Sequence, residues 1–260
     1  MNLKDKVAVV TGGAKGNGLG IVEVFVKYGA KVVILDKDEK IAEVVKKFRE
    51  DSADVKGCLV DIRNQQEVNE AIKKVNDYFG KIDILVNNAG VCKLTPFEQM
   101  DNEIRDFHFD VNIKGSFNVT QACLPYMNQN SSIINLSSVT GCMVADPGEV
   151  AYATTKAALI GFTKSLAVEL APKNIRVNAI SPGYIRTPMV EDMARISNPE
   201  DPESVIKGIG DAIPMKRLGY IQEIGELAAF LASDASSYIT GENIVISGGS
   251  TLPETLTMGV

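Results

Sequence analysis

Tryptophan is absent from this 260-residue sequence, and aromatic residues make up only 6% of it. The core must therefore be packed with aliphatic and small side chains, as in layered folds built on valine, isoleucine and alanine. Histidine is nearly absent too, since His108 is the single example, and no two of the four cysteines form a C-x-x-C pair. The common zinc and redox motifs are thereby excluded, so we expect no metal site and free thiols in a reducing compartment.

An excess of basic residues is also missing, because the formal net charge is −6. Nucleic acids and anionic membranes bind basic faces, so we expect neither as a partner. No apolar run approaches the roughly 20 residues that span a bilayer. The N-terminus lacks the apolar segment of a signal peptide. These absences predict a soluble cytoplasmic protein.

Short aliphatic runs are what the sequence does contain, and they alternate with longer amphipathic stretches such as residues 64–79. Continuous apolar runs are typical of parallel strands that are covered on both faces. They lie at residues 7–10, 32–35, 55–60, 84–86, 133–136, 175–180 and 244–246. The pattern predicts the α/β class: a Rossmann-type, doubly wound, seven-stranded parallel sheet with helices on both faces, in three layers.

No linker or low-complexity segment divides the chain, so we expect residues 1–260 to form a single domain. The regular alternation fails only at about 184–220, a polar stretch that contains Pro188, Pro199, Pro202 and Pro214. A stretch of this length in a compact domain usually acts as a lid or binding loop. We therefore expect a substrate lid at about 188–215.

A glycine-rich turn follows the first predicted strand and contains Gly12, Gly16 and Gly18, with a helix from about Leu19. Glycines let the backbone turn tightly and approach a pyrophosphate, and the helix N-terminus offers free N–H groups. The position of the turn between a strand and a helix is the context that a dinucleotide-binding motif requires.

The second predicted strand ends in Asp36. A carboxylate there can accept hydrogen bonds from both ribose hydroxyls and would repel a 2′-phosphate, which favours NAD. Lys15 and Lys37 argue for NADP, because each could pair with that phosphate. A carboxylate in direct contact should outweigh exposed lysines, whose ion pairs contribute about 0–1 kcal/mol. We expect NAD, with NADP as the alternative.

Tyr152 and Lys156 are four residues apart in a predicted helix and therefore share one of its faces. A free tyrosine has a pKa of about 10, and an ammonium group about 4 Å away could lower it by as much as ~3 pH units. Tyr152 thus becomes a candidate acid/base. Ser138 follows the strand at 133–136, at the edge where ligands bind, and can polarise a substrate oxygen.

Together these residues resemble the short-chain dehydrogenase/reductase family, and the resemblance extends from Lys6 to about Gly249. Its motifs occur in order: TGGAKGNG at 11–18, Asp61-Ile62, NNAG at 87–90, Asn112, Ser138, YATTK at 152–156 and SPG at 181–183. The stretches SSVTGCMVADPGEVAYATTKAA, IRTPM, SNPEDPES and GGSTLPET further resemble the bacterial UcpA-type oxidoreductases within this family.

The resemblance implies a set of roles. The catalytic residues would be Asn112, Ser138, Tyr152 and Lys156, with Asn112 kinking a helix and placing a water that relays protons to Lys156. The dinucleotide would be held by Gly12, Gly16, Asn17, Gly18, Leu19, Asp36, Asp61, Ile62, Asn88, Gly90, Tyr152, Lys156, Pro182, Gly183, Ile185 and Thr187. Asn17 is a departure, because the family usually has isoleucine there; its amide either contacts a ribose or phosphate or is a neutral change.

The implied activity is NAD(P)-dependent interconversion of a secondary alcohol and a ketone, with a small-molecule substrate. A steroid, a polyol and a small keto compound all remain open. The alternatives are an NADPH-dependent carbonyl or 3-oxoacyl reductase and, more remotely, a non-catalytic dinucleotide sensor. The family is commonly tetrameric, so we expect a homo-oligomer.

Overall fold

The structure is a computed structural model that describes residues 1–51 and 53–252. Its sheet has seven parallel strands in the order β3-β2-β1-β4-β5-β6-β7, which confirms the predicted Rossmann-type sheet. The order reverses between β1 and β4, and ligands bind beside such a reversal, at the carboxyl ends of the strands. The strands are β1 (Val7–Thr11), β2 (Lys31–Asp36), β3 (Val55–Leu59), β4 (Ile82–Asn87), β5 (Met127–Leu136), β6 (Arg176–Pro182) and β7 (Asn243–Ile246).

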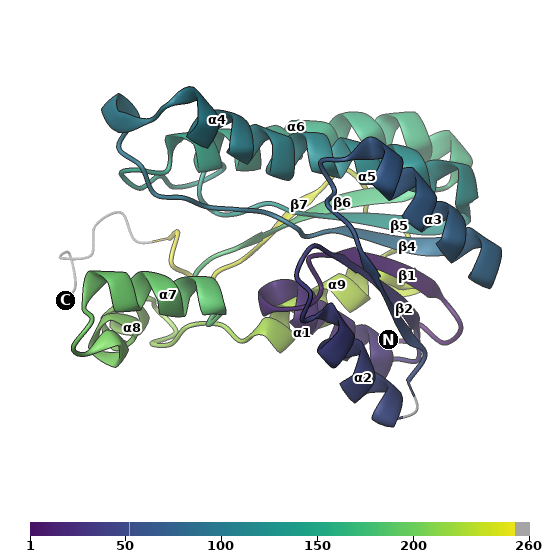
Figure 1. The fold of residues 1–260 in the computed structure, drawn as a ribbon, viewed down its shortest axis with the longest axis horizontal. Helices are drawn as coiled ribbons and strands as arrows, with labels where there is room; N and C mark the ends of the chain where they lie inside the picture. The colour runs from purple at the N-terminus through teal and green to yellow at the C-terminus, as the bar shows by residue number, and fades with distance from the viewer. Residues whose placement is uncertain (52, 253–260) are drawn as a thin grey trace.

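Helices cover both faces of the sheet (Figure 1). One face packs against α1 (Gly16–Lys27), α2 (Ile41–Glu50) and α9 (Ile221–Ala232). The other packs against α3 (Gln65–Phe79), α5 (Gly115–Cys123) and α6 (Val150–Leu170), with α4 (Asn102–Phe109) alongside. Successive side chains of a strand point to opposite faces. Ala8 and Val10 of β1 accordingly lie in the first core, and Val7 and Val9 in the second.

Short helical turns complete the connections. A π-helical turn at Asp110–Lys114 joins α4 to α5. Further 3-10 turns lie at Phe97–Gln99, Leu124–Tyr126, Ala171–Lys173 and Asp234–Ser236. Within the described ranges, no helix combines the length and the apolar character needed to cross a bilayer.

The predicted lid region consists of two helices, α7 (Pro188–Ser197) and α8 (Pro202–Ala212), at the edge where β6 ends (Figure 1). Two of its prolines, Pro188 and Pro202, begin these helices rather than interrupting them, because proline suits the first helical position. The Thr187 hydroxyl caps α7 by accepting a hydrogen bond from Val190 N. Asp201 caps α8 in the same way through Ser204 N.

Helix α1 begins at Gly16, whereas the sequence predicted its start near Leu19.

Candidate active site

Two adjoining cavities open at the carboxyl edge of the sheet. The first, here called the long cleft, has a volume of about 500 Å³ and extends from the β1–α1 turn to Lys156. The second, here called the side cavity, measures about 480 Å³ and reaches Met193 and Ile209 of the lid helices. Both cavities are lined by Tyr152, which places its phenol where they join.

Most residues expected to hold the dinucleotide line the long cleft. They are Gly12, Gly16, Asn17, Asp36, Asp61, Ile62, Asn88, Gly90, Tyr152, Lys156, Pro182 and Thr187. Gly183 and Ile185 line the side cavity instead, together with Ser138. Gly18, Leu19 and Asn112 line neither cavity.

The start of α1 is suited to bind an anion. Lys15 at the N-cap makes no side-chain capping bond, so the first N–H groups of the helix are free to bind a phosphate group. Gly18 has a supporting role, because a Cβ there would lie 2.1 Å from the carbonyl oxygen of Gly12. The Asn88 amide donates hydrogen bonds to the carbonyl oxygens of Thr11 at 2.9 Å and Gly12 at 3.0 Å, which ties the end of β4 to this turn.

Asp36 lies at the end of β2 with its carboxylate held by the backbone. Its two oxygens accept hydrogen bonds from Ala14 N and Asp38 N, both at 3.0 Å. Lys15, which sequence analysis considered as a phosphate partner, instead forms an ion pair with Asp38 at 3.5 Å. Lys37 Nζ lies 5.6 Å from the ring centre of Phe107. The carboxylate is therefore the fixed charge at this point of the cleft.

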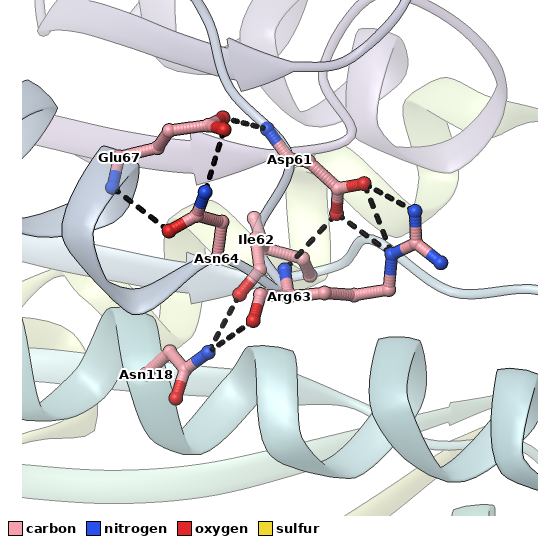
Figure 2. A network of polar contacts seen from close by, with 6 residues as sticks. All are labelled: Asp61, Ile62, Arg63, Asn64, Glu67 and Asn118. Carbon is pink, nitrogen blue, oxygen red and sulfur yellow. Dashed lines mark hydrogen bonds and ion pairs between the residues drawn. The ribbon is translucent and has the colours of Figure 1, made fainter.

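Figure 2 shows how the loop after β3 is held. The Asp61 carboxylate accepts a hydrogen bond from Arg63 Nε at 2.9 Å, and this bond lowers the pKa of Asp61. Asn118 of α5 donates to the carbonyl oxygens of Ile62 at 2.9 Å and Arg63 at 3.2 Å. The sequence predicted that Asp61 contacts the dinucleotide, but it did not identify Arg63 or Asn118 as supporting residues. Arg63 is only two residues from Asp61, whereas the contact of Asn118 follows from the tertiary fold and carries no local sequence signal.

Tyr152, Lys156 and Ser138 come together as predicted. The Lys156 Nζ atom lies 5.6 Å from the ring centre of Tyr152, and both side chains line the long cleft. A hydrogen bond with Ser138 lowers the pKa of the Tyr152 phenol. Ser138 Oγ also accepts from Thr140 N at 3.1 Å, which orients its hydroxyl.

The expected acidification of Tyr152 by Lys156 alone is wrong. Burial raises the pKa of the phenol above its usual value and outweighs the hydrogen bond from Ser138. Lys156 Nζ donates to the carbonyl oxygen of Leu136 at 2.7 Å, and burial lowers the pKa of this amine to about 8. In the polypeptide by itself, burial therefore opposes ionisation of the phenol, and a positive charge bound nearby would act in the opposite direction.

Asn112 lies in the π-helical turn, with its side chain buried. Its Oδ1 accepts from Val91 N at 2.8 Å, and its Nδ2 donates to Val91 O at 3.1 Å and to Thr155 Oγ1 at 2.9 Å. The amide thereby joins α6 to the loop after β4. A Cβ on Gly90 would lie 3.3 Å from both Asn112 Oδ1 and Lys156 Nζ, so these two groups flank the same backbone position. Thr155 is a further supporting residue that sequence analysis did not identify.

These features fit a bound dinucleotide. The uncapped helix start suits the pyrophosphate, the Asp36 carboxylate suits a ribose diol, and Tyr152 and Lys156 lie at the far end of the same cleft. In the described part of the chain, no group of three or more His, Cys, Asp or Glu side chains is arranged to hold a metal ion.

Comparisons with known proteins agree with this geometry. Residues 12–251 match the family model described as "Enoyl-(Acyl carrier protein) reductase". The chain is 54% identical over 260 residues to oxidoreductase UcpA of Escherichia coli strain K12, with 99% of each chain covered.

Two solved structures are also similar. Aldohexose dehydrogenase of Thermoplasma acidophilum, in ligand-free form, has a TM-score of 0.90 and 34% identity, covering 99% of this chain and 98% of that one. L-Sorbose reductase of Gluconobacter frateurii, complexed with NADPH and L-sorbose, has a TM-score of 0.92 and 29% identity, covering 97% and 99%. With its fold, its paired tyrosine and lysine and these full-length similarities, the chain belongs to the short-chain dehydrogenase/reductase family, whose members are oxidoreductases of alcohols and carbonyl compounds.

Proposed function

We propose that the protein interconverts a secondary alcohol and a ketone by hydride transfer, with NAD as its favoured dinucleotide. The observation that carries this proposal is the position of Tyr152 at the junction of the two cavities, with Ser138 and Lys156 around it. A substrate in the side cavity and a dinucleotide in the long cleft would meet at this phenol.

In the oxidative direction, Tyr152 accepts the proton of the substrate hydroxyl, and the Ser138 hydroxyl holds the substrate oxygen. When bound, the dinucleotide supplies the hydride acceptor and, in its oxidised form, a positive charge near the phenol. That charge would lower the pKa of Tyr152, which the polypeptide by itself raises. Lys156 would also hold the nicotinamide ribose. The proposed route of the proton to solvent passes Lys156 Nζ and a water placed by Asn112, and Lys156 Nζ and Asn112 Oδ1 both lie against Gly90.

The remaining roles are proposed for the other residues of the cleft. The glycine turn and Asn17 would hold the pyrophosphate, Asp61 and Ile62 the adenine, and Asn88 and Gly90 the ribose. Pro182, Gly183, Ile185 and Thr187 would surround the nicotinamide, and their positions along the wall between the two cavities support this.

Replacing Tyr152 tests the proposal. Tyr152→Phe removes the hydroxyl that exchanges the proton, so we expect turnover to fall by about 1000-fold or more, while dinucleotide affinity is retained. Reduced-cofactor absorbance measures turnover, and fluorescence titration measures affinity. Tyr238→Phe is the matched control, because Tyr238 is fully exposed. Retained turnover in Tyr152→Phe would show that another group exchanges the proton.

An NADPH-dependent carbonyl or 3-oxoacyl reductase is the second candidate. Lys37, exposed beside Asp36 in the long cleft, supports it, as does the similarity to a reductase complexed with NADPH. Titration with NADH and NADPH separates the two: tighter binding of NADPH would favour the reductase. A non-catalytic sensor is disfavoured by the presence of Tyr152 and Lys156 together.

We further propose that the protein is a homotetramer and that α7 and α8 act as a lid over the substrate. An aromatic pair on the face of α5 and α6, of which Phe117 is exposed, supports the association. Phe117 and Phe162 stack with ring centres 4.3 Å apart, and Phe117 remains 43% exposed. Exposed apolar patches often mark contact surfaces. The single-domain organisation and the cytoplasmic location stay predictions.

A further inference from the structure

The walls of the side cavity carry negative charge and no positive charge. Asp146 and Glu149 line it, and no lysine or arginine is found among its described lining residues. A carboxylate or phosphate on a substrate would therefore be repelled without a compensating partner. Met189, Met193 and Ile209 form an apolar part of the wall against which a carbon skeleton can pack.

Glu149 differs from Asp146 because one oxygen of its carboxylate is buried without a hydrogen-bond partner in the described part of the chain. Burial, and then the charge of Asp146, raise the pKa of the Tyr184 phenol. The Oε1 atom of Glu149 accepts a hydrogen bond from Cys92 Sγ at 4.0 Å. Its Oε2 is buried and accepts no hydrogen bond within the described chain. Buried polar atoms are nearly always hydrogen-bonded, so the carboxylate of Glu149 is expected to gain a donor when the cavity that this residue lines is occupied.

The same carboxylate lies close to the reacting group. Glu149 directly precedes α6, three residues before Tyr152, and its negative charge raises the pKa of that phenol. A substrate oxygen held by Tyr152 and Ser138 would therefore place its neighbouring carbons near Glu149. Asn17 Oδ1 is a second buried acceptor without a partner, and Asn17 lines both cavities.

From this geometry we propose that Glu149 accepts a hydrogen bond from a second hydroxyl of the substrate, so that neutral polyhydroxy alcohols and their ketones are the preferred substrates. The inference rests on the proposed function, because it assigns the substrate class of the same site. The similarity to an aldohexose dehydrogenase and an L-sorbose reductase, both named for polyhydroxylated compounds, supports it.

Four-carbon secondary alcohols provide a matched test. The probes are 2-butanol, 2,3-butanediol, 3-hydroxybutyrate and 3-amino-2-butanol, each measured as kcat/KM with saturating dinucleotide. A hydrogen bond to a charged group corresponds to about a 10- to 100-fold preference, so the wild type should prefer the diol over 2-butanol by at least about tenfold. It should use 3-hydroxybutyrate least, because of its carboxylate.

Variants of Glu149 test whether this residue causes the preference for the diol over 2-butanol. In Glu149→Ala the ratio of diol to 2-butanol should fall to within about threefold of unity, while turnover of 2-butanol persists. Glu169→Gln is the matched control, since Glu169 is an exposed residue at the other end of α6 and should leave the ratio unchanged. Asp146→Asn should change it less than Glu149→Ala does.

A pH profile of alcohol oxidation adds a measurement that would not change if Glu149 had only a structural role. The charged or titratable groups around Glu149 are Cys92, Asp146, Tyr152, Tyr184 and Lys156. Glu149→Gln removes a negative charge that raises the pKa of Tyr152. Alcohol oxidation needs the ionised phenol, so its half-maximal rate should move to lower pH.

The outcomes separate this inference from the proposed function. Turnover that depends on Tyr152 but shows no diol preference, or a preference that survives in Glu149→Ala, overturns the role of Glu149 alone. A higher kcat/KM for the amino alcohol than for the diol would also overturn it, because the site would then select a cation. Absence of turnover with every alcohol tested, and with the matching ketones, counts against both.

Discussion

At the scale of single residues, Asp36 has a structural role and, in the proposed function, a recognition role. Its carboxylate accepts hydrogen bonds from Ala14 N in the glycine turn and from Asp38 N, and it lines the long cleft beside Lys37. The backbone bonds fix the negative charge at a defined point, where a ribose diol can donate to it and a 2′-phosphate is repelled.

Replacing Asp36 should therefore change which dinucleotide is preferred. In Asp36→Ala we expect NADH to bind about 10- to 100-fold more weakly, because charge-assisted hydrogen bonds are lost, while NADPH binding weakens less. Fluorescence titration with both reduced cofactors measures the two affinities. Asp77→Asn, a surface change on α3, serves as the control. An unchanged ratio of affinities would mean that Asp36 does not select the cofactor.

Gly90 offers a second test at this scale. A methyl group there would lie 3.3 Å from Lys156 Nζ and from Asn112 Oδ1, so these groups must shift by a few tenths of an ångström. Because small misplacements of catalytic groups are costly, we expect Gly90→Ala to lower kcat by about tenfold. Steady-state kinetics measure the effect. Gly161→Ala is a matched control on α6, since a Cβ at that position meets nothing within 4 Å.

At the scale of elements, the junction of α6 with the π-helical turn positions the reacting groups. Thr155 is fully buried, donates to Tyr152 O at 2.8 Å and accepts from Asn112 Nδ2. The bond from Asn112 fixes the turn of α6 that carries Tyr152 and Lys156 against the loop after β4. π-Helical turns often occur at functional sites, and this one points Asn112 inward.

Thr155→Val should weaken that junction without changing its shape. The valine leaves a buried amide donor with one partner fewer, so we expect the free energy of unfolding to fall by about 1–3 kcal/mol. Denaturant titration measures the loss. The neighbouring Thr154→Val should have almost no effect, because Thr154 is exposed and bonds only within its own helix. Equal stabilities for the two variants would contradict this account.

The elements differ in how well the sequence predicts them. The seven strands follow from the aliphatic runs, since Val9, Ile84 and Val177 are buried because of their chemistry. The helices α7 and α8 were not expected, because polar, proline-containing segments are also typical of loops, and only the caps at Thr187 and Asp201 distinguish them.

The residues of the candidate site also differ in how well the sequence predicts their contacts. Tyr152, Lys156 and Ser138 have a spacing that predicts their meeting. The contact of Asn118 with Ile62 and Arg63 joins positions more than fifty residues apart, which no local pattern indicates. The direction of the pKa shift of Tyr152 in the polypeptide was predicted wrongly, because the burial that raises this pKa depends on tertiary structure.

At the scale of the whole molecule, the stack of the exposed Phe117 on the partly buried Phe162 predicts association. Phe117→Glu places a charge on this face, so we expect light scattering to report a smaller species than the wild type. Phe97→Glu is the control, because Phe97 is exposed on a separate 3-10 turn. A wild-type protein that is already monomeric would contradict the proposed tetramer.

The two cavities draw their walls from nearly the full length of the chain, from Gly12 to Ser250. A partially synthesised polypeptide that ends before α6 would contain the glycine turn, the proposed phosphate site, but would lack Tyr152 and Lys156, the groups proposed to exchange the proton. Even one that ends at β6 would lack Ile209 and Ser250, which complete the side cavity. The two cavities should therefore be complete only late in biosynthesis. Prematurely terminated chains should have no oxidoreductase activity on any substrate.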